Sequence, residues 1–353
     1  MLACPRCGDI LAATSGRSIR CACGAQFPVL AGVVPVLVVD PQVHLRASRA
    51  RYGRHASMMR SALVGFDELR TQRARDPEAL SRISTGLQRN LVLLEAWLAL
   101  ISEALGPGPA DPAGDLDGGP RHAGGLNLNA IVRHLVTDWG WRARSEQMLA
   151  QVATIIRDGC GDLGPKTRAV CLGAGAGRIG WELRERCAEV VAIDLEVAFG
   201  ATNALLASSD LVACDPLESN ARAIADLCPE ITLHRPAAPN VITCVADALR
   251  PPILRQHADL LLSSFFTDIV GFPQLLRVAH ALLPRGGTLM HFGPLGYARY
   301  EPAEMWTVEE SRHHLAENGF QIRREAWLDH EVWPNASMVT NRVSSWLVVA
   351  TRT

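Results

Sequence analysis

Apolar positions divide the chain into a helical part followed by an alternating part. Between residues 41 and 105 the apolar side chains recur every three or four positions, as in Leu87, Leu91 and Leu94, which predicts helices. From residue 126 to the end, short apolar runs typical of strands alternate with helical segments. This alternation predicts an α/β fold, in which helices cover both faces of a mostly parallel sheet.

A glycine-rich loop follows one of the strand patterns in the second part. Residues 168–172 form a short, mostly apolar run, the loop Gly173-Ala174-Gly175-Ala176-Gly177-Arg178 comes next, and residues 179–183 have helical spacing. A second apolar run, 189–193, ends at Asp194, 21 positions after Gly173. Strand, loop, helix, strand and acid in this order predict a site where a ligand approaches the loop backbone and its ribose meets the carboxylate.

The loop favours S-adenosylmethionine over a dinucleotide as the ligand. It reads G-x-G-x-G-R rather than G-x-G-x-x-G, and no Lys or Ser follows it to bind a pyrophosphate. A further acid, Asp247, follows a later apolar run. NAD or FAD, and glycines that serve only the turn, remain the alternatives. The expected cofactor-binding residues are Gly173, Ala174, Gly175, Gly177, Arg178, Asp194, Asp247, Ala248, Ser264 and Phe265.

Two later segments give the chain a more specific resemblance. Residues 258–264 lead into Phe265-Phe266-Thr267-Asp268, and residues 288–292 lead into Gly293-Pro294-Leu295-Gly296-Tyr297. From about Leu126 to its end, the chain resembles the carnosine N-methyltransferase-like family, class I S-adenosylmethionine-dependent enzymes that methylate an imidazole nitrogen. Further matching segments are Asp138-Trp139, Trp181-Glu182, Leu283-Pro284-Arg285-Gly286-Gly287, Asn318-Gly319-Phe320 and Asn335-Ala336-Ser337-Met338.

The resemblance implies a Rossmann-like domain with a mostly parallel seven-stranded sheet and an adenine-binding role for Asp247. It also implies methyl transfer to an imidazole-like nitrogen of a small molecule or a peptide. Such a transfer is an in-line displacement without a covalent enzyme intermediate. The protein therefore acts mainly by aligning the nucleophile, the methyl group and the sulfur.

The chain also departs from the family. The family's histidine after GPLxY is Ala298 here, its asparagine before GPL is His291, and Trp333 lies where tyrosines are expected. Carnosine itself is therefore not carried over as the substrate. The candidate catalytic residues are Asp268, to hydrogen-bond the acceptor's far nitrogen, His291, to replace the missing histidine, and Tyr297, to line the acceptor pocket. A helix N-cap, a strand-end histidine and a packing tyrosine are the respective alternatives.

Four cysteines crowd the first 23 residues. They form a Cys-x-x-Cys pair and a Cys-x-Cys pair with thirteen residues between the pairs, and they are Cys4, Cys7, Cys21 and Cys23. Gly8 and Gly24 follow the pairs, where tight turns need a positive φ. The spacing predicts a tetrahedral Zn²⁺ site, and the first 40 residues resemble the zinc ribbon that precedes some bacterial methyltransferases. Such zinc would be structural; incidental cysteines and a catalytic zinc are the alternatives.

Length and charge bound the remaining possibilities. The 353 residues carry a formal net charge of −1, which gives no general attraction to nucleic acid or to anionic membranes. No run is long and apolar enough to span a bilayer, and the first residues lack a secretory signal, so a cytoplasmic protein is expected. We expect a zinc ribbon at 1–40, a helical region and Gly/Pro-rich linker at 41–125, and a methyltransferase domain at 126–353.

One local charge surplus keeps other functions open. Between Val43 and Asn90 ten arginines oppose four acids, a surplus of +6. A solvated helical face explains this surplus, and so does an RNA base methyltransferase whose ribbon and helices hold RNA. A non-catalytic module that binds cofactor and a partner is a further alternative. The favoured partner is a small molecule or peptide with an imidazole-like acceptor, and peptide modification is one such role.

Overall fold

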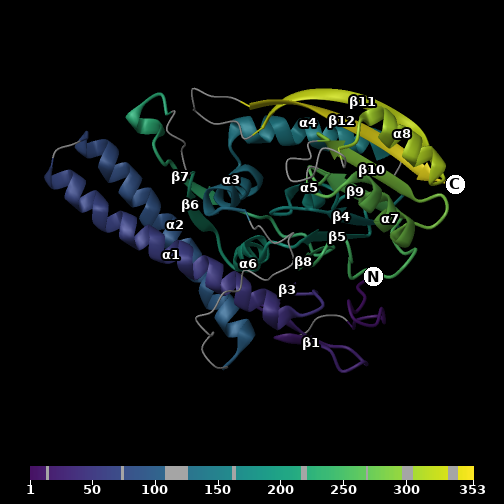
Figure 1. Ribbon diagram of the computed structural model, residues 1–353, viewed down its shortest axis with the longest axis horizontal. Helices are drawn as coiled ribbons and strands as arrows, with labels where there is room; N and C mark the ends of the chain where they lie inside the picture. Colours follow the sequence, from purple (N-terminus) through teal and green to yellow (C-terminus); the bar gives the residue numbers. More distant parts are fainter. Residues whose placement is uncertain are drawn as a thin grey trace.

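The computed structural model describes residues 1–12, 16–72, 75–107, 126–160, 164–215, 221–267, 269–295, 305–332 and 341–353. Its centre is a seven-stranded sheet in the order β11-β12-β10-β9-β4-β5-β8 (Figure 1). The strands are β4 (Arg168–Leu172), β5 (Glu189–Asp194), β8 (Val241–Val245), β9 (Leu260–Ser264), β10 (Thr288–Gly293), β11 (Phe320–Val332) and β12 (Asn341–Arg352). In this sheet β12 runs antiparallel to both of its neighbours, and the other pairings are parallel.

Alternating side chains along the strands supply two apolar faces. In β4, Val170 and Leu172 join one buried cluster, whereas Ala169 and Cys171 join another. Helices α7 and α8 contribute to the first cluster, and α4 and the end of α5 contribute to the second. These helices are α4 (Ala143–Cys160), α5 (Arg178–Glu182), α7 (Phe272–Leu282) and α8 (Val308–Glu317). The predicted α/β class, a mostly parallel seven-stranded sheet with helices on both faces, is therefore confirmed.

The first part of the chain forms a small sheet followed by a helical hairpin. The sheet consists of β1 (Ser18–Arg20), β2 (Gln26–Leu30) and β3 (Val34–Pro35), with antiparallel pairing throughout. Helices α1 (Pro41–Thr71) and α2 (Pro77–Leu105) then form a hairpin that projects from the body of the molecule (Figure 1). Asp76 begins α2 by accepting hydrogen bonds from the backbone N–H groups of Glu78 and Ala79, and Gly106 ends it with a φ of 67°.

The small sheet and the hairpin share apolar cores with the large sheet. Val36 forms a parallel bridge with Val245, and the N–H of Leu37 donates to the Val245 carbonyl at 2.8 Å, so this segment continues the sheet beyond the end of β8. Tyr52 of α1 and Trp97 of α2 are fully buried in one cluster with residues of the remaining helices. The remaining elements are α3 (Leu128–Trp139), α6 (Val197–Leu206), β6 (Leu211–Cys214), β7 (Glu230–Leu233) and a 3₁₀ turn at Ile224–Asp226.

The domain boundaries at 40 and 125 stay predictions, and the stretch 108–125 lies outside the described residues. Within the described part of the chain, no helix has the length and apolar character needed to cross a membrane.

The close packing of α6 against β8 and β3 leads to a first prediction. A Cβ on Gly200 of α6 would lie 2.4 Å from the Val245 side chain and 3.4 Å from that of Val34, whereas one on Gly53 of α1 would meet nothing within 4 Å. We expect Gly200→Ala to lower the free energy of unfolding by about 1–3 kcal/mol through overpacking. Gly53→Ala should raise it by about 0.5–1 kcal/mol because alanine favours the helix. Denaturant unfolding measures both, and equal effects would contradict the packing described.

Candidate functional site

The predicted cofactor residues meet at one edge of the sheet. The parallel strands β4, β5, β8 and β9 end there, and the glycine loop, Asp194, Asp247 and Ser264 lie at or just after those ends. β4 and β9 are neighbours in the sheet, but β4 leads along the chain to β5 on its other side. A switch of this kind leaves a crevice outside the strand ends, which is where ligands bind in open α/β sheets.

The glycine loop owes its shape to three left-handed residues. Gly173, Gly175 and Gly177 have φ values of 59°, 57° and 98°, which favour residues without a Cβ. A Cβ on Gly173 would also lie 2.5 Å from the ring of Phe266. The loop turns tightly enough for the Gly175 N–H to donate to Asp194 Oδ2 at 2.8 Å. The loop and the acid at the end of β5 therefore form one unit.

Two carboxylates flank this loop. Asp194 and Asp138 each keep a partly exposed surface, and desolvation by the surrounding protein raises the pKa of each to about 7. Asp138 Oδ2 accepts a hydrogen bond from the Arg178 backbone N–H at 3.3 Å. Asp138 is a site residue that the sequence reasoning missed, although the Asp138-Trp139 match was its signal.

Arg178 is held by protein partners. It is 2% exposed, and its guanidinium donates to Glu146, to Glu182 and to the Asp138 carbonyl. It also lies 4.0 Å from the ring centroid of Trp141. The cofactor-binding role of Arg178 stays a prediction.

Asp247, the acid predicted to bind adenine, lies in a turn after β8. Asp247 Oδ1 accepts the N–H of Leu249 at 2.8 Å, and its carbonyl accepts the N–H of Arg250 at 3.0 Å. Ala248 between them is buried. The Ala246 N–H donates to the Asp194 carbonyl at 2.9 Å, which ties this turn to the end of β5.

The end of β9 presents a buried hydroxyl and a strained aromatic residue. Ser264 is 9% exposed, and its Oγ has no hydrogen-bond partner among the described residues. Phe265 follows with a φ of 49°, which is unusual for a residue with a bulky side chain. Its ring lies edge-on to Phe292 and to His330, with centroids 5.4 Å and 5.5 Å away. An unpartnered buried hydroxyl beside a strained backbone is typical of a ligand site.

Of the three candidate catalytic residues, the structure describes only His291. Asp268 and Tyr297 lie outside the described residues. His291 is fully buried in β10, its ring nitrogens lie 3.4 Å from Ser263 Oγ and 3.5 Å from Thr267 Oγ1, and desolvation lowers its pKa to about 4. It is therefore a neutral histidine at pH 7, and its catalytic role stays a prediction.

His330 of β11 is a second residue that sequence reasoning missed. It is 5% exposed, and its Nδ1 lies 3.4 Å from the Leu328 carbonyl. A carbonyl oxygen only accepts, so Nδ1 carries the proton in this contact and Nε2 keeps a lone pair. Nε2 is buried and has no partner in the part of the chain that the structure describes, and desolvation lowers the pKa of the ring. Nothing near position 330 in the sequence signals this placement.

The four predicted zinc ligands come together. The sulfur atoms of Cys4, Cys7, Cys21 and Cys23 all lie within 4.8 Å of one another. Cys4 Sγ and Cys23 Sγ are 3.8 Å apart, and Cys7 Sγ and Cys21 Sγ are 3.5 Å apart. Gly8 and Gly24 adopt φ values of 83° and 84°, as the turns require. Zn–S bonds of about 2.3 Å place the sulfurs of a tetrahedral site roughly 3.8 Å apart, so the cluster fits zinc.

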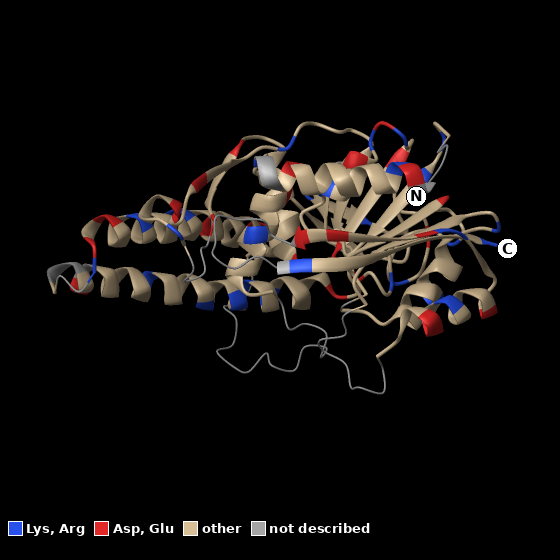
Figure 2. Cartoon of the chain, turned by 90° about the horizontal axis from the view of Figure 1, so that it is seen from above, with Lys and Arg blue, Asp and Glu red and all other residues tan. Residues whose placement is uncertain are grey.

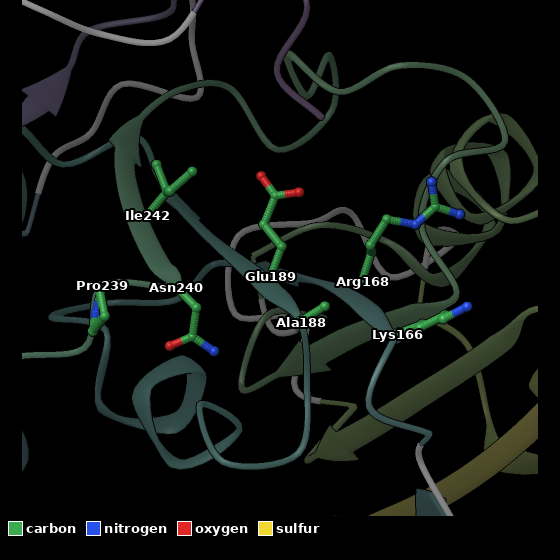
Figure 3. A pocket seen from close by; sticks show the side chains of 7 residues that line it. All are labelled: Lys166, Arg168, Ala188, Glu189, Pro239, Asn240 and Ile242. Carbon is green, nitrogen blue, oxygen red and sulfur yellow. The ribbon is translucent and has the colours of Figure 1, made fainter.

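A surface hollow of about 760 Å³ lies at the opposite edge of the sheet (Figure 3). It is lined by Lys166, Arg168, Ala188, Glu189, Pro239, Asn240 and Ile242, where β4, β5 and β8 begin. Arg168 is already paired with Asp259, with Nε and Oδ2 3.1 Å apart. Because the glycine loop lies at the carboxyl ends of the strands, this hollow is separate from the candidate site.

No protein-family model and no curated protein matches the chain. Solved structures resemble it at low identity. An N-methyltransferase from Bradyrhizobium japonicum WM9, bound to S-adenosylhomocysteine, is 12% identical over 63% of this chain and 96% of its own, with a TM-score of 0.39. A geranyl diphosphate C-methyltransferase from Streptomyces coelicolor A3(2) is 14% identical over 60% and 84%, with a TM-score of 0.39. The fibrillarin pre-rRNA processing protein of Methanococcus jannaschii is 17% identical over 54% and 69%, with a TM-score of 0.34.

These proteins act on different molecules according to their names, and at this level of similarity they give no guide to the substrate of this chain. The function therefore rests on the site itself.

The raised pKa of Asp194 makes a prediction about stability. Between about pH 4 and pH 7 the native carboxyl holds a proton that the unfolded chain has lost, so the free energy of unfolding falls as the pH rises through this window. Asp194→Asn cannot ionise. We expect its free energy of unfolding to gain about 1–3 kcal/mol on that of the wild type between pH 4 and pH 8, as measured by denaturant unfolding.

Asp259→Asn is the control for that experiment. Burial opposes ionisation of Asp259, but hydrogen bonds from Arg168 outweigh burial and lower its pKa. Its removal should therefore reduce stability at pH 8. A stability difference between Asp194→Asn and the wild type that stays constant from pH 4 to pH 8 would contradict the desolvation described.

Proposed function

We propose that the chain is an S-adenosylmethionine-dependent methyltransferase. The observation that carries the proposal is the glycine loop at the switch point between β4 and β9, with its Gly175 N–H bonded to the acid that ends β5. In this proposal Asp194 accepts hydrogen bonds from the ribose hydroxyls. Asp247, near the end of β8, holds the adenine amino group.

Charge favours a sulfonium ligand over a pyrophosphate. Asp138 and Asp194 accept hydrogen bonds from the loop backbone, and the nearby Arg178 is already engaged by Glu146 and Glu182. Helix α5 has only five residues, so it offers little dipole to an anion. A cluster of carboxylates repels a dinucleotide phosphate and attracts a cation.

For the acceptor, we propose an imidazole-like nitrogen of a small molecule or peptide, as the family resemblance implies. S-adenosylmethionine supplies an electrophilic methyl group when bound. The chain's own residues bind and orient the acceptor beside it. Two buried polar atoms that have no partner among the described residues offer hydrogen bonds to such an acceptor: Ser264 Oγ, directly before Phe265, and Nε2 of His330, whose ring contacts that of Phe265.

The ion pairs of the basic helices make RNA a weaker candidate acceptor than the count of arginines along the chain suggests. Arg51, Arg60, Arg82 and Arg89 form ion pairs with glutamates, with N–O distances of 2.6 to 3.1 Å. Figure 2 shows acidic segments among the basic ones on the hairpin. Four of the ten arginines are therefore neutralised in place and are less available to phosphates.

For the cysteine cluster we propose a structural Zn²⁺ held by four thiolates. Cys4 and Cys21 are buried, Cys7 and Cys23 are exposed, and all four ligand positions belong to the protein. A closed site of this kind supplies folding energy to a segment too small to fold by core burial.

A methyl-transfer assay tests the proposed activity. The wild type, Asp194→Asn and the control Asp259→Asn are incubated with methyl-labelled S-adenosylmethionine, histidine dipeptides, histidine-containing peptides and total RNA. Label should enter the imidazole compounds with the wild type and the control. Transfer by Asp194→Asn should fall about tenfold or more because a charge-assisted hydrogen bond to the ribose is lost. Label in RNA alone, or none at all, would overturn the proposal.

Metal analysis tests the zinc site. We expect one zinc per chain in the wild type and in Cys187→Ser, whose thiol lies in the core far from the cluster in sequence. Cys21→Ser should lose most of the zinc and melt at a lower temperature, because removing one of four thiolates opens the site. Full zinc content in Cys21→Ser would exclude the cluster as the ligand set.

A further inference from the structure

Side chains of helix α1 form hydrogen bonds with the loop that follows Asp194. His44 of α1 places a ring nitrogen 3.0 Å from the Leu195 carbonyl. Arg51 Nη2 donates to Glu196 Oε1 at 2.6 Å, and the hydroxyl of Tyr52 donates to the same oxygen. The Tyr52 hydroxyl also accepts the N–H of Ala198 at 2.9 Å. The loop between β5 and α6 is therefore fastened to a helix about 145 positions earlier in the chain.

That loop in turn holds the acid of the candidate cofactor site. The Glu196 N–H donates to Asp194 Oδ1 at 2.9 Å, while the Gly175 N–H donates to Oδ2 at 2.8 Å. Each carboxylate oxygen thus accepts one of these two hydrogen bonds. A carboxylate has about four acceptor positions, so acceptor capacity remains for the hydroxyls of a ribose.

We propose that Glu196 is a positioning residue of the cofactor site: anchored by Arg51 and Tyr52, it orients Asp194 for the cofactor ribose and makes α1 a part of that site. This inference rests on the proposed function. Glu196 is 8% exposed and its N–H donates to Asp194, so it acts through Asp194. A buried ion pair contributes little net stability compared with apolar packing, so its role in orienting the loop is the stronger reason for its presence.

The proposal has an electrostatic consequence. The Glu196 charge opposes ionisation of Asp194, and the Arg51 charge compensates Glu196. The other titratable and charged groups that face this cluster are Asp138 of α3, Asp247 after β8, His44, Tyr52 and His55 of α1, and Arg178 beside the loop. Asp194 must be ionised to accept two ribose hydroxyls, so affinity for the cofactor should rise with pH.

Titration calorimetry with S-adenosylhomocysteine from pH 6 to pH 8.5 tests the proposal on the full-length protein. Glu196→Gln should shift the midpoint of the affinity profile down by about half a pH unit or more, because a negative charge is removed. Arg51→Gln should shift it up by a similar amount, because the Glu196 charge is left uncompensated. Tyr52→Phe should weaken binding about threefold or more, because the loop loses one anchor.

Arg60→Gln is the matched control. Arg60 lies on the same helix and pairs with Glu95 at the same N–O distance of 2.6 Å, but away from the site. It should leave both the affinity and its midpoint unchanged. Melting temperatures of all variants separate binding effects from loss of fold.

The outcomes distinguish the two proposals. Opposite shifts for Glu196→Gln and Arg51→Gln support the positioning role, since a purely structural role would lower affinity equally at each pH. Unshifted midpoints in variants of a binding wild type would overturn the inference and leave the proposed function standing. A wild type that does not bind S-adenosylhomocysteine at any pH would overturn the proposed function and the inference with it.

Discussion

The two N–H groups that hold the Asp194 carboxylate are the constraint on which the site depends. Gly175 reaches one oxygen because the glycine loop adopts left-handed backbone angles, and Glu196 reaches the other because α1 fixes the following loop. A carboxylate held this way beside Asp138 and largely desolvated by the surrounding protein is costly when no ligand is bound. This cost falls at the carboxyl ends of β4 and β5, two strands that each pair with a neighbouring strand on both sides.

Much of this arrangement could be predicted from the sequence because it depends on neighbouring residues. The strand ends, the turn glycines and the cysteine knuckles are all local patterns, and the structure has them in place. The contribution of α1 was beyond such reasoning, because Tyr52 and Glu196 are 144 positions apart and meet only once the hairpin has packed. His330 belongs to the same class, since it lies 65 positions after Phe265 and its ring meets that of Phe265 only in the folded chain.

The charge of the hairpin shows a similar limit. A window from 43 to 90 contains the arginines but only some of their partners, since Glu95, Glu196 and Glu230 lie outside it. A local surplus counted along the chain therefore overstates the positive potential of the folded surface. The histidine at 291 is the reverse case: its residue type suggests chemistry, while its full burial beside Phe272 and Trp346 gives it the surroundings of a core residue.

The segment that joins the ribbon to α1 also protects the large sheet from other chains. An unpaired edge strand is a template for association with a second sheet. At one edge, the bridge from Val36 to Val245 and the Leu37 N–H cover the end of β8. At the other, β11 has an irregularity between Ile322 and Arg324 and carries several charged side chains. Both borders of the sheet thus discourage edge-to-edge aggregation, one by occupation and the other by shape and charge.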